Sequence, residues 1–172
     1  MSQDLARYIR DIPDFPKPGI VFKDITTLLQ VPEALDEAIQ KMSDPFRDKG
    51  VEQVVGIESR GFIFGAAMAR ELNAGFVPIR KPGKLPAETL AMSYELEYGT
   101  DQIEIHKDAV QDGQHVLLVD DLLATGGTME AACGLVSSLG GHIEGVVFLV
   151  ELAFLDGRKK LEGQEIFSLI QY

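Results

Sequence analysis

Apolar residues along this chain fall into short runs that alternate with longer segments of helical spacing. The short runs have the length and the Val, Ile and Phe content of buried strands, and they cover residues 53–57, 76–79, 116–119, 143–150 and 166–170. The longer segments repeat apolar residues every three or four positions, and they cover residues 33–48, 62–72 and 129–139. This alternation predicts an α/β fold, a single domain with a mostly parallel central sheet flanked by helices.

Two segments depart from this alternation. Residues 2–11 have the spacing of a short amphipathic helix, and a run of prolines then predicts an extended path into the apolar residues at 20–25. Residues 90–106 alternate apolar and polar positions on both sides of Gly99, which predicts a β-hairpin that projects from the core. Such an arm can close over a site and exclude water.

Composition narrows the class of protein. The chain has 172 residues, 45% of them hydrophobic, which is enough for one domain with its own core. Its single cysteine, Cys133, predicts a buried thiol in a reducing compartment, and no apolar run reaches membrane-spanning length, so we expect a cytoplasmic protein. A net charge of −11 argues against nucleic acid or an anionic membrane as the main partner.

Chemistry-bearing residues follow the apolar run at 116–119. Asp120 and Asp121 come where this strand is expected to end, at the sheet edge where open α/β folds bind ligands. A turn then leads into a predicted helix, and its backbone N–H groups suit a phosphate; the turn comprises Ala124, Thr125, Gly126, Gly127 and Thr128. Because carboxylates repel phosphate, the acid pair suits a vicinal diol or a metal ion, and a diol beside one phosphate is a ribose 5-phosphate.

Two other nucleotide-binding motifs do not fit this segment. No lysine lies between Asp112 and Leu155, so the segment is not a G-x-x-x-x-G-K-[ST] loop, and no G-x-G-x-x-G follows the strand. An acidic strand end followed by an ordinary helix cap is the alternative that remains.

Cations follow two other predicted strands. Ser59 and Arg60 lie in the turn after residues 53–57, and Arg80, Lys81 and Lys84 follow residues 76–79, with no acid between positions 77 and 87. In so acidic a chain this cluster predicts a second anion site, for which a guanidinium suits phosphate well. A solvent-facing arginine and hydrated turn lysines remain the alternative.

The motif at 116–128 resembles the phosphate-binding signature of the phosphoribosyltransferase family. Matches to the adenine branch of that family extend over nearly the whole chain, as F-P-K-P-G-I-V-F-K-D at 15–24, E-S-R-G-F at 58–62, I-R-K-P-G-K-L-P at 79–86, L-E-Y-G at 96–99, V-D-D-L-L-A-T-G-G-T at 119–128 and L-V-E-L at 149–152. The resemblance implies the type I phosphoribosyltransferase fold, with a small hood at about 1–32 and 151–160 and a flexible hairpin at about 90–106 over the site. It also implies a homodimer.

The resemblance further implies a reaction and its residues. Adenine and phosphoribosyl diphosphate would give AMP and diphosphate, with Mg²⁺ held by substrate and water rather than directly by the protein. Ser59, Arg60, Arg80, Lys81 and Lys84 would bind diphosphate, and residues 120, 121 and 124–128 the ribose 5-phosphate. The adenine pocket would comprise Val21, Phe22, Lys23, Leu122 and Leu152.

The resemblance also implies a proton-transfer residue. The branches that use hypoxanthine and guanine carry an acid at the position of Ala124, which cannot serve, and the adenine branch implies Glu97 instead. Without the resemblance, Glu97 is more simply a solvated hairpin residue. Two alternatives for the whole chain are a transferase for another purine, such as xanthine, and a regulator that binds phosphoribosyl diphosphate without turnover. The regulator would need a basic nucleic-acid-binding face, which the sequence lacks.

Overall fold

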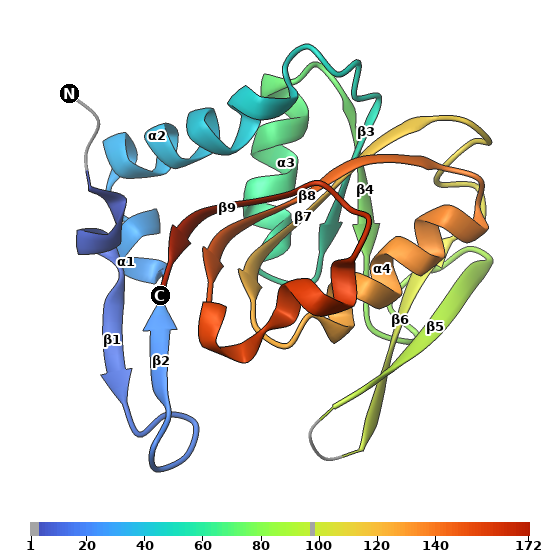
Figure 1. Ribbon diagram of the computed structural model, residues 1–172. Coiled ribbons are helices and arrows are strands. Elements are labelled where there is room, and N and C mark those ends of the chain that lie inside the picture. The colour runs from blue at the N-terminus through green and yellow to red at the C-terminus, as the bar shows by residue number, and fades with distance from the viewer. Residues whose placement is uncertain (1–3, 97–98) are drawn as a thin grey trace.

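The computed structural model describes residues 4–96 and 99–172, built around one five-stranded sheet (Figure 1). The strands are β3 (Gln53–Ile57), β4 (Gly75–Ile79), β7 (His115–Leu123), β8 (His142–Glu151) and β9 (Ile166–Gln171). They run in the order β4-β3-β7-β8-β9, and every neighbouring pair is parallel. The predicted α/β fold with a parallel central sheet is confirmed, and β9 is an edge strand as expected.

Helices cover both faces of the sheet. α2 (Pro32–Ser43) and α3 (Gly61–Glu71) pack on one face, and α4 (Gly127–Ser138) packs on the other. Short helical turns complete the chain, namely η1 (Leu5–Tyr8), α1 (Thr26–Leu29), η2 (Asp44–Phe46), η3 (Ala153–Leu155) and η4 (Gly157–Leu161). The helical segment predicted at 33–48 is interrupted, because α2 ends at Ser43 and a 3₁₀ turn that contains Pro45 follows.

Each face of the sheet has its own apolar core. Strand side chains alternate between the two, so that in β7 Val116 and Leu118 point toward α4 while Leu117 and Val119 point toward α2 and α3. Cys133 lies in the α4 core, where burial raises its pKa to about 12. The predicted buried thiol is confirmed.

Two antiparallel ribbons flank the edge at which the sheet strands end (Figure 1). One consists of β1 (Arg10–Pro13) and β2 (Val21–Asp24), and the other of β5 (Thr89–Glu95) and β6 (Thr100–His106). The second ribbon is the predicted hairpin, and its inner face packs against α4. Among the described residues, no helix combines the length and apolar character that a membrane span requires.

Two predicted boundaries were wrong. The segment at 2–11 is not one helix, because residues 10–13 leave the η1 turn and pair with residues 21–24 as strand β1. β7 does not end before Asp120, because its pairing with β8 continues as far as Leu122 opposite Val150 and Leu123 opposite Glu151. Asp120 and Asp121 therefore lie within strand β7, near its carboxyl end, and not on the loop beyond it.

Candidate functional site

The carboxyl ends of β3 and β7 enclose a cleft of about 370 Å³. Eight of the predicted site residues line it, namely Ser59, Arg60, Lys81, Asp120, Asp121, Leu122, Ala124 and Thr128. The structure thus brings together residues from three segments that are up to 69 positions apart in sequence (59 to 128). Ile57, Glu58 and Tyr94 complete the lining.

The two acids that line this cleft, Asp120 and Asp121, have different surroundings. Asp121 is buried, and the Arg60 guanidinium donates to its Oδ2 across 2.5 Å. Burial and the neighbouring Asp121 charge raise the pKa of Asp120 well above its ordinary value. In the absence of a ligand Asp120 therefore retains a proton more readily than an ordinary aspartate, and hydroxyl donors or a cation would relieve that cost.

Close packing fixes the position of Asp120. Gly61 opens α3 directly behind it, and a Cβ at Gly61 would lie 2.9 Å from Asp120 Oδ1 and 3.0 Å from the Val119 carbonyl oxygen. Only glycine allows the start of α3, and with it the Arg60 turn, to lie this close to the end of β7.

Two of the cations expected to bind diphosphate, Arg80 and Lys81, are paired with acids in this structure. Arg80 binds Glu58 through two hydrogen bonds, of 2.9 and 3.2 Å, and these lower the pKa of Glu58. Lys81 pairs with Asp101 on the hairpin and donates to the Tyr94 hydroxyl at 2.8 Å. An anion in the cleft would have to replace these acids.

Two of the four predicted cations, Arg60 and Lys81, line the cleft, and the other two, Arg80 and Lys84, do not. Lys81 lines the cleft, whereas Lys84 is exposed on the turn beyond it and its carbonyl oxygen accepts from Arg80 at 3.5 Å. Arg80 and Lys84 are thus adjacent to the site but outside the cleft lining.

The loop at 124–128 encloses a small pocket of about 80 Å³, directly beside the cleft. Gly126 has φ +85°, and α4 begins at the next residue, so the first residues of that helix, whose N–H groups have no partner within the helix, line the pocket. The loop rests on the segment after β8, because a Cβ at Gly126 would lie 2.4 Å from the Gly157 carbonyl oxygen and one at Gly157 would lie 2.4 Å from that of Ala124. A turn that leads into a helix N-terminus suits a phosphate group, and this cavity is called the phosphate pocket.

The ribbon of β1 and β2 forms a larger, mainly apolar cavity of about 580 Å³ with the segment after β8. Val21, Lys23 and Leu152 line it, as predicted for the base pocket, together with Ile20, Phe154, Leu155 and Tyr172. Thr125 lines both this cavity and the phosphate pocket, so the two are neighbours.

Backbone groups rather than side chains of β2 are available for polar contacts in this cavity. The Lys23 ammonium is bound to Asp11 at 2.7 Å and lies 3.9 Å from the centre of the Tyr172 ring. Since β2 pairs only with β1 among the described strands, its outer edge leaves alternate N–H and C=O groups without a strand partner.

Two residues predicted for the base pocket line other surfaces. Leu122 lines the cleft and the phosphate pocket. Phe22 packs edge-on against Phe15, with ring centroids 5.3 Å apart, and lies beneath the Arg60 guanidinium at 5.6 Å. Phe22 therefore connects the β1–β2 ribbon to the turn after β3. Glu97, the predicted proton-transfer residue, lies outside the described residues.

Sequence reasoning missed three polar residues of the site. Glu58 holds Arg80 and also accepts the Lys81 backbone N–H at 2.9 Å, and Tyr94 and Asp101 hold Lys81 from the hairpin. Glu58 belongs to the E-S-R-G-F match at 58–62, and this motif could have identified it as a candidate site residue. The two hairpin residues carry no local signal, because only the packing of the hairpin on α4 brings them to the cleft.

Comparisons with known proteins agree with this geometry. The phosphoribosyl transferase domain family matches residues 24–165. An adenine phosphoribosyltransferase of Halothermothrix orenii is 60% identical over 168 residues, covering 98% of this chain and 99% of that protein. The crystal structure of the Thermoanaerobacter pseudethanolicus enzyme of that name superposes with a TM-score of 0.96 over the full length of both chains, at 55% identity. The Saccharomyces cerevisiae enzyme, solved with adenine and an imino-altritol bisphosphate, has a TM-score of 0.92 at 40% identity, covering 98% of this chain and 97% of that one.

Proposed function

The chain belongs to the phosphoribosyltransferase family, in its adenine branch, and we propose that its three adjoining cavities divide one reaction between them. The reaction transfers the 5-phosphoribosyl group from phosphoribosyl diphosphate to adenine and gives AMP and diphosphate, a step of purine salvage. The observation that carries the proposed division is that the phosphate pocket shares lining residues with both the acidic cleft and the apolar cavity.

The sugar phosphate would lie over the end of β7. The N–H groups of residues 125–128 would bind the 5-phosphate, with Thr125 and Thr128 adding hydroxyl donors. The Asp120 and Asp121 carboxylates would accept from the two ribose hydroxyls. Because Asp120 gains hydrogen-bond donors in this arrangement, ribose binding would lower its raised pKa and leave it ionised.

Diphosphate would occupy the cleft beside Ser59, Arg60 and Lys81, with Arg80 and Lys84 contributing from the adjacent turn. Cleavage of the bond at C1 places negative charge on the leaving oxygens, and preorganised cations stabilise that charge. Lys81 would exchange Asp101 for diphosphate as the ligand binds.

The cleft also fits the Mg²⁺ that this family implies. The diphosphate would supply the oxygen ligands that Mg²⁺ prefers, and the two carboxylates that line the cleft, with the raised pKa of Asp120, mark a position where added positive charge is favourable. We propose that substrate oxygens and water hold the ion, which would neutralise charge on the diphosphate. We also propose a homodimer, which the resemblance implies, and a cytoplasmic location, which the single buried cysteine favours.

Adenine would enter the apolar cavity against Val21 and Leu152. An N–H and a C=O on the outer edge of β2 would pair with ring nitrogen N1 and the 6-amino group. A 6-oxo purine presents the opposite donor pattern at that edge and would leave a buried polar group unpaired, at a cost of about 1–3 kcal/mol. Phe22 and Leu122 would contact the purine only if the ligand extends from the cavity into the cleft.

Purine specificity tests the proposal directly. The protein is incubated with phosphoribosyl diphosphate, Mg²⁺ and one purine at a time, and diphosphate release is measured. We expect release with adenine alone. Release with xanthine, hypoxanthine or guanine would assign another base, and binding of phosphoribosyl diphosphate without turnover would make the chain a regulator.

A further inference from the structure

Two histidines lie side by side at the edge of the sheet opposite the cleft. His115 begins β7 and His142 begins β8, and the two are register partners in the parallel ladder. Their rings are in edge contact with centroids 5.3 Å apart. The residues that follow them, Val116 and Ile143, pack into the α4 core, so the alternation of strand side chains directs both imidazoles to the other face.

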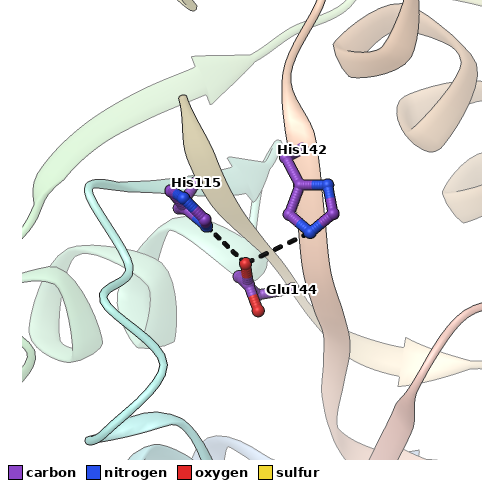
Figure 2. Close-up of side chains that lie close together, drawn as sticks. All are labelled: His115, His142 and Glu144. Carbon is purple, nitrogen blue, oxygen red and sulfur yellow. Dashed lines mark hydrogen bonds and ion pairs between the residues drawn. The ribbon is translucent and has the colours of Figure 1, made fainter. Parts of the chain in front are cut away.

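A β-bulge adds a carboxylate to this pair. The ladder pairs Val116 with Ile143 but Leu117 with Gly145, so Glu144 is the extra residue. Figure 2 shows the Glu144 carboxylate directed at both rings. Its Oε1 atom lies 2.5 Å from His115 Nδ1 and 3.4 Å from His142 Nε2.

We propose that His115, His142 and Glu144 bind one divalent transition metal ion of the Zn²⁺ class. The three ligand atoms lie within 4.8 Å of one another. Bonds of about 2.0–2.1 Å to a tetrahedral ion place neighbouring ligand atoms about 3.4 Å apart, which is the separation of the His142 and Glu144 atoms already. The His115 side chain is 47% exposed, so a small adjustment of its side-chain torsions would move the ring away from the carboxylate by about 1 Å.

The donor set selects the kind of metal. Two imidazole nitrogens and one carboxylate oxygen suit Zn²⁺, Ni²⁺ or Cu²⁺, whereas Mg²⁺ prefers oxygen ligands. The surroundings are anionic, because the Glu52 carboxylate accepts the His115 backbone N–H at 2.9 Å and the chain carries a net charge of −11. Cys133 does not compete for the metal, since it is buried and its pKa is raised to about 12.

The location separates this site from the proposed reaction. His115 precedes Asp120 by five residues in the same strand, a distance of roughly 16 Å. An ion there would join the first residues of β7 and β8, the two strands whose far ends carry the acid pair and Glu151. It would bind the folded chain and not the unfolded one, and so raise stability without entering the cleft.

The test uses tag-free, metal-depleted protein. Isothermal titration with Zn²⁺ is compared for the wild type, His142→Gln and Glu144→Gln, with His106→Gln as the matched control because His106 is the remaining histidine and lies on the hairpin. We expect one Zn²⁺ per chain, binding at least about tenfold weaker in the first two variants, and wild-type affinity in the control. At a Zn²⁺ concentration about 100 times Kd, Tm should rise by about 5–10 °C.

A Co²⁺ absorption spectrum provides a second measurement. The intense visible bands of four-coordinate Co²⁺ are expected in the wild type and in His106→Gln, and their loss is expected in His142→Gln. The proposal is overturned if Zn²⁺ does not bind, if His142→Gln and Glu144→Gln bind it as the wild type does, or if equimolar Mg²⁺ displaces it.

Discussion

Lys81, on the turn after β4, forms an ion pair with Asp101 of the β5–β6 hairpin. The same ammonium donates to the Tyr94 hydroxyl, and these two partners raise its pKa although burial opposes the charge. In this structure the hairpin therefore binds Lys81, which is also the cation proposed to bind diphosphate. Binding of diphosphate and release of the hairpin would be coupled through this one ammonium group.

Replacement of Asp101 by Asn should strengthen binding of phosphoribosyl diphosphate. The variant leaves Lys81 without its competing carboxylate, and since both side chains are partly exposed, we expect KM to fall by about 2- to 5-fold. Steady-state kinetics measure this change. The control is Glu88→Gln, which breaks the exposed Lys107–Glu88 pair and should leave KM unaltered. A higher KM in Asp101→Asn would mean that Asp101 itself contacts the ligand.

Glu97→Gln should lower kcat and leave AMP affinity largely intact. General acid–base catalysis contributes about 10²- to 10⁴-fold, and the amide keeps the size of the side chain while removing its titration. Rapid-quench turnover and AMP titration measure the two quantities separately. Glu95→Gln, two residues earlier in the sequence, is the matched control and should retain kcat. Equal losses of turnover and AMP affinity in Glu97→Gln would remove the proton-transfer role.

Asp120→Asn should stabilise the ligand-free protein while weakening substrate binding. A carboxyl whose pKa is raised by folding costs stability at pH values above its ordinary pKa of 3.8, and that cost disappears below it. At pH 7.5 we expect Tm to rise by about 2–4 °C, as about 1 kcal/mol produces in a protein of this size, and the gain should vanish as the pH falls below about 4.

Thermal melts across pH check this sign, with the exposed Asp108→Asn as the control. The variant should also raise KM for phosphoribosyl diphosphate, because a ribose hydroxyl loses an anionic acceptor. A lower Tm for Asp120→Asn at pH 7.5 would show that the Asp120 charge is favourable in the free protein.

Asp24 should show the opposite pH dependence. Thr26 donates to it through its side chain and backbone, and Arg10 also donates, so the pKa of Asp24 is lowered from 3.8 to about 2. The ionised form therefore contributes stability that is fully present above about pH 4 and is lost as the pH falls toward 2. We expect Asp24→Asn to lower Tm at pH 7, and the difference from the wild type to shrink across that window. A difference independent of pH would mean that charge is not responsible.

The sequence predicted the parts of this molecule that local pattern determines. β3 occupies residues 53–57 as expected, and α4 begins beside the glycine pair at 126–127 because Gly126 supplies the left-handed turn. The misses come from partners distant in sequence. Residues 10–13 form a strand because residues 21–24 pair with them, and the cations after β4 bind Glu58 and Asp101 rather than standing free. The histidine pair needs the register of β7 and β8 and has no sequence signature.

The contact between Gly126 and Gly157 joins two stretches of main chain with no side chain between them. The position of the loop on the segment after β8 is consequently set by main-chain atoms at this contact, and exchanges at Thr125 or Thr128 can alter the hydroxyl donors without changing it. Position 157 has no such freedom. Even a methyl group there would collide with the Ala124 carbonyl oxygen and displace the loop, so an enzyme derived from this one can vary its chemistry at the loop only while that distant glycine is retained.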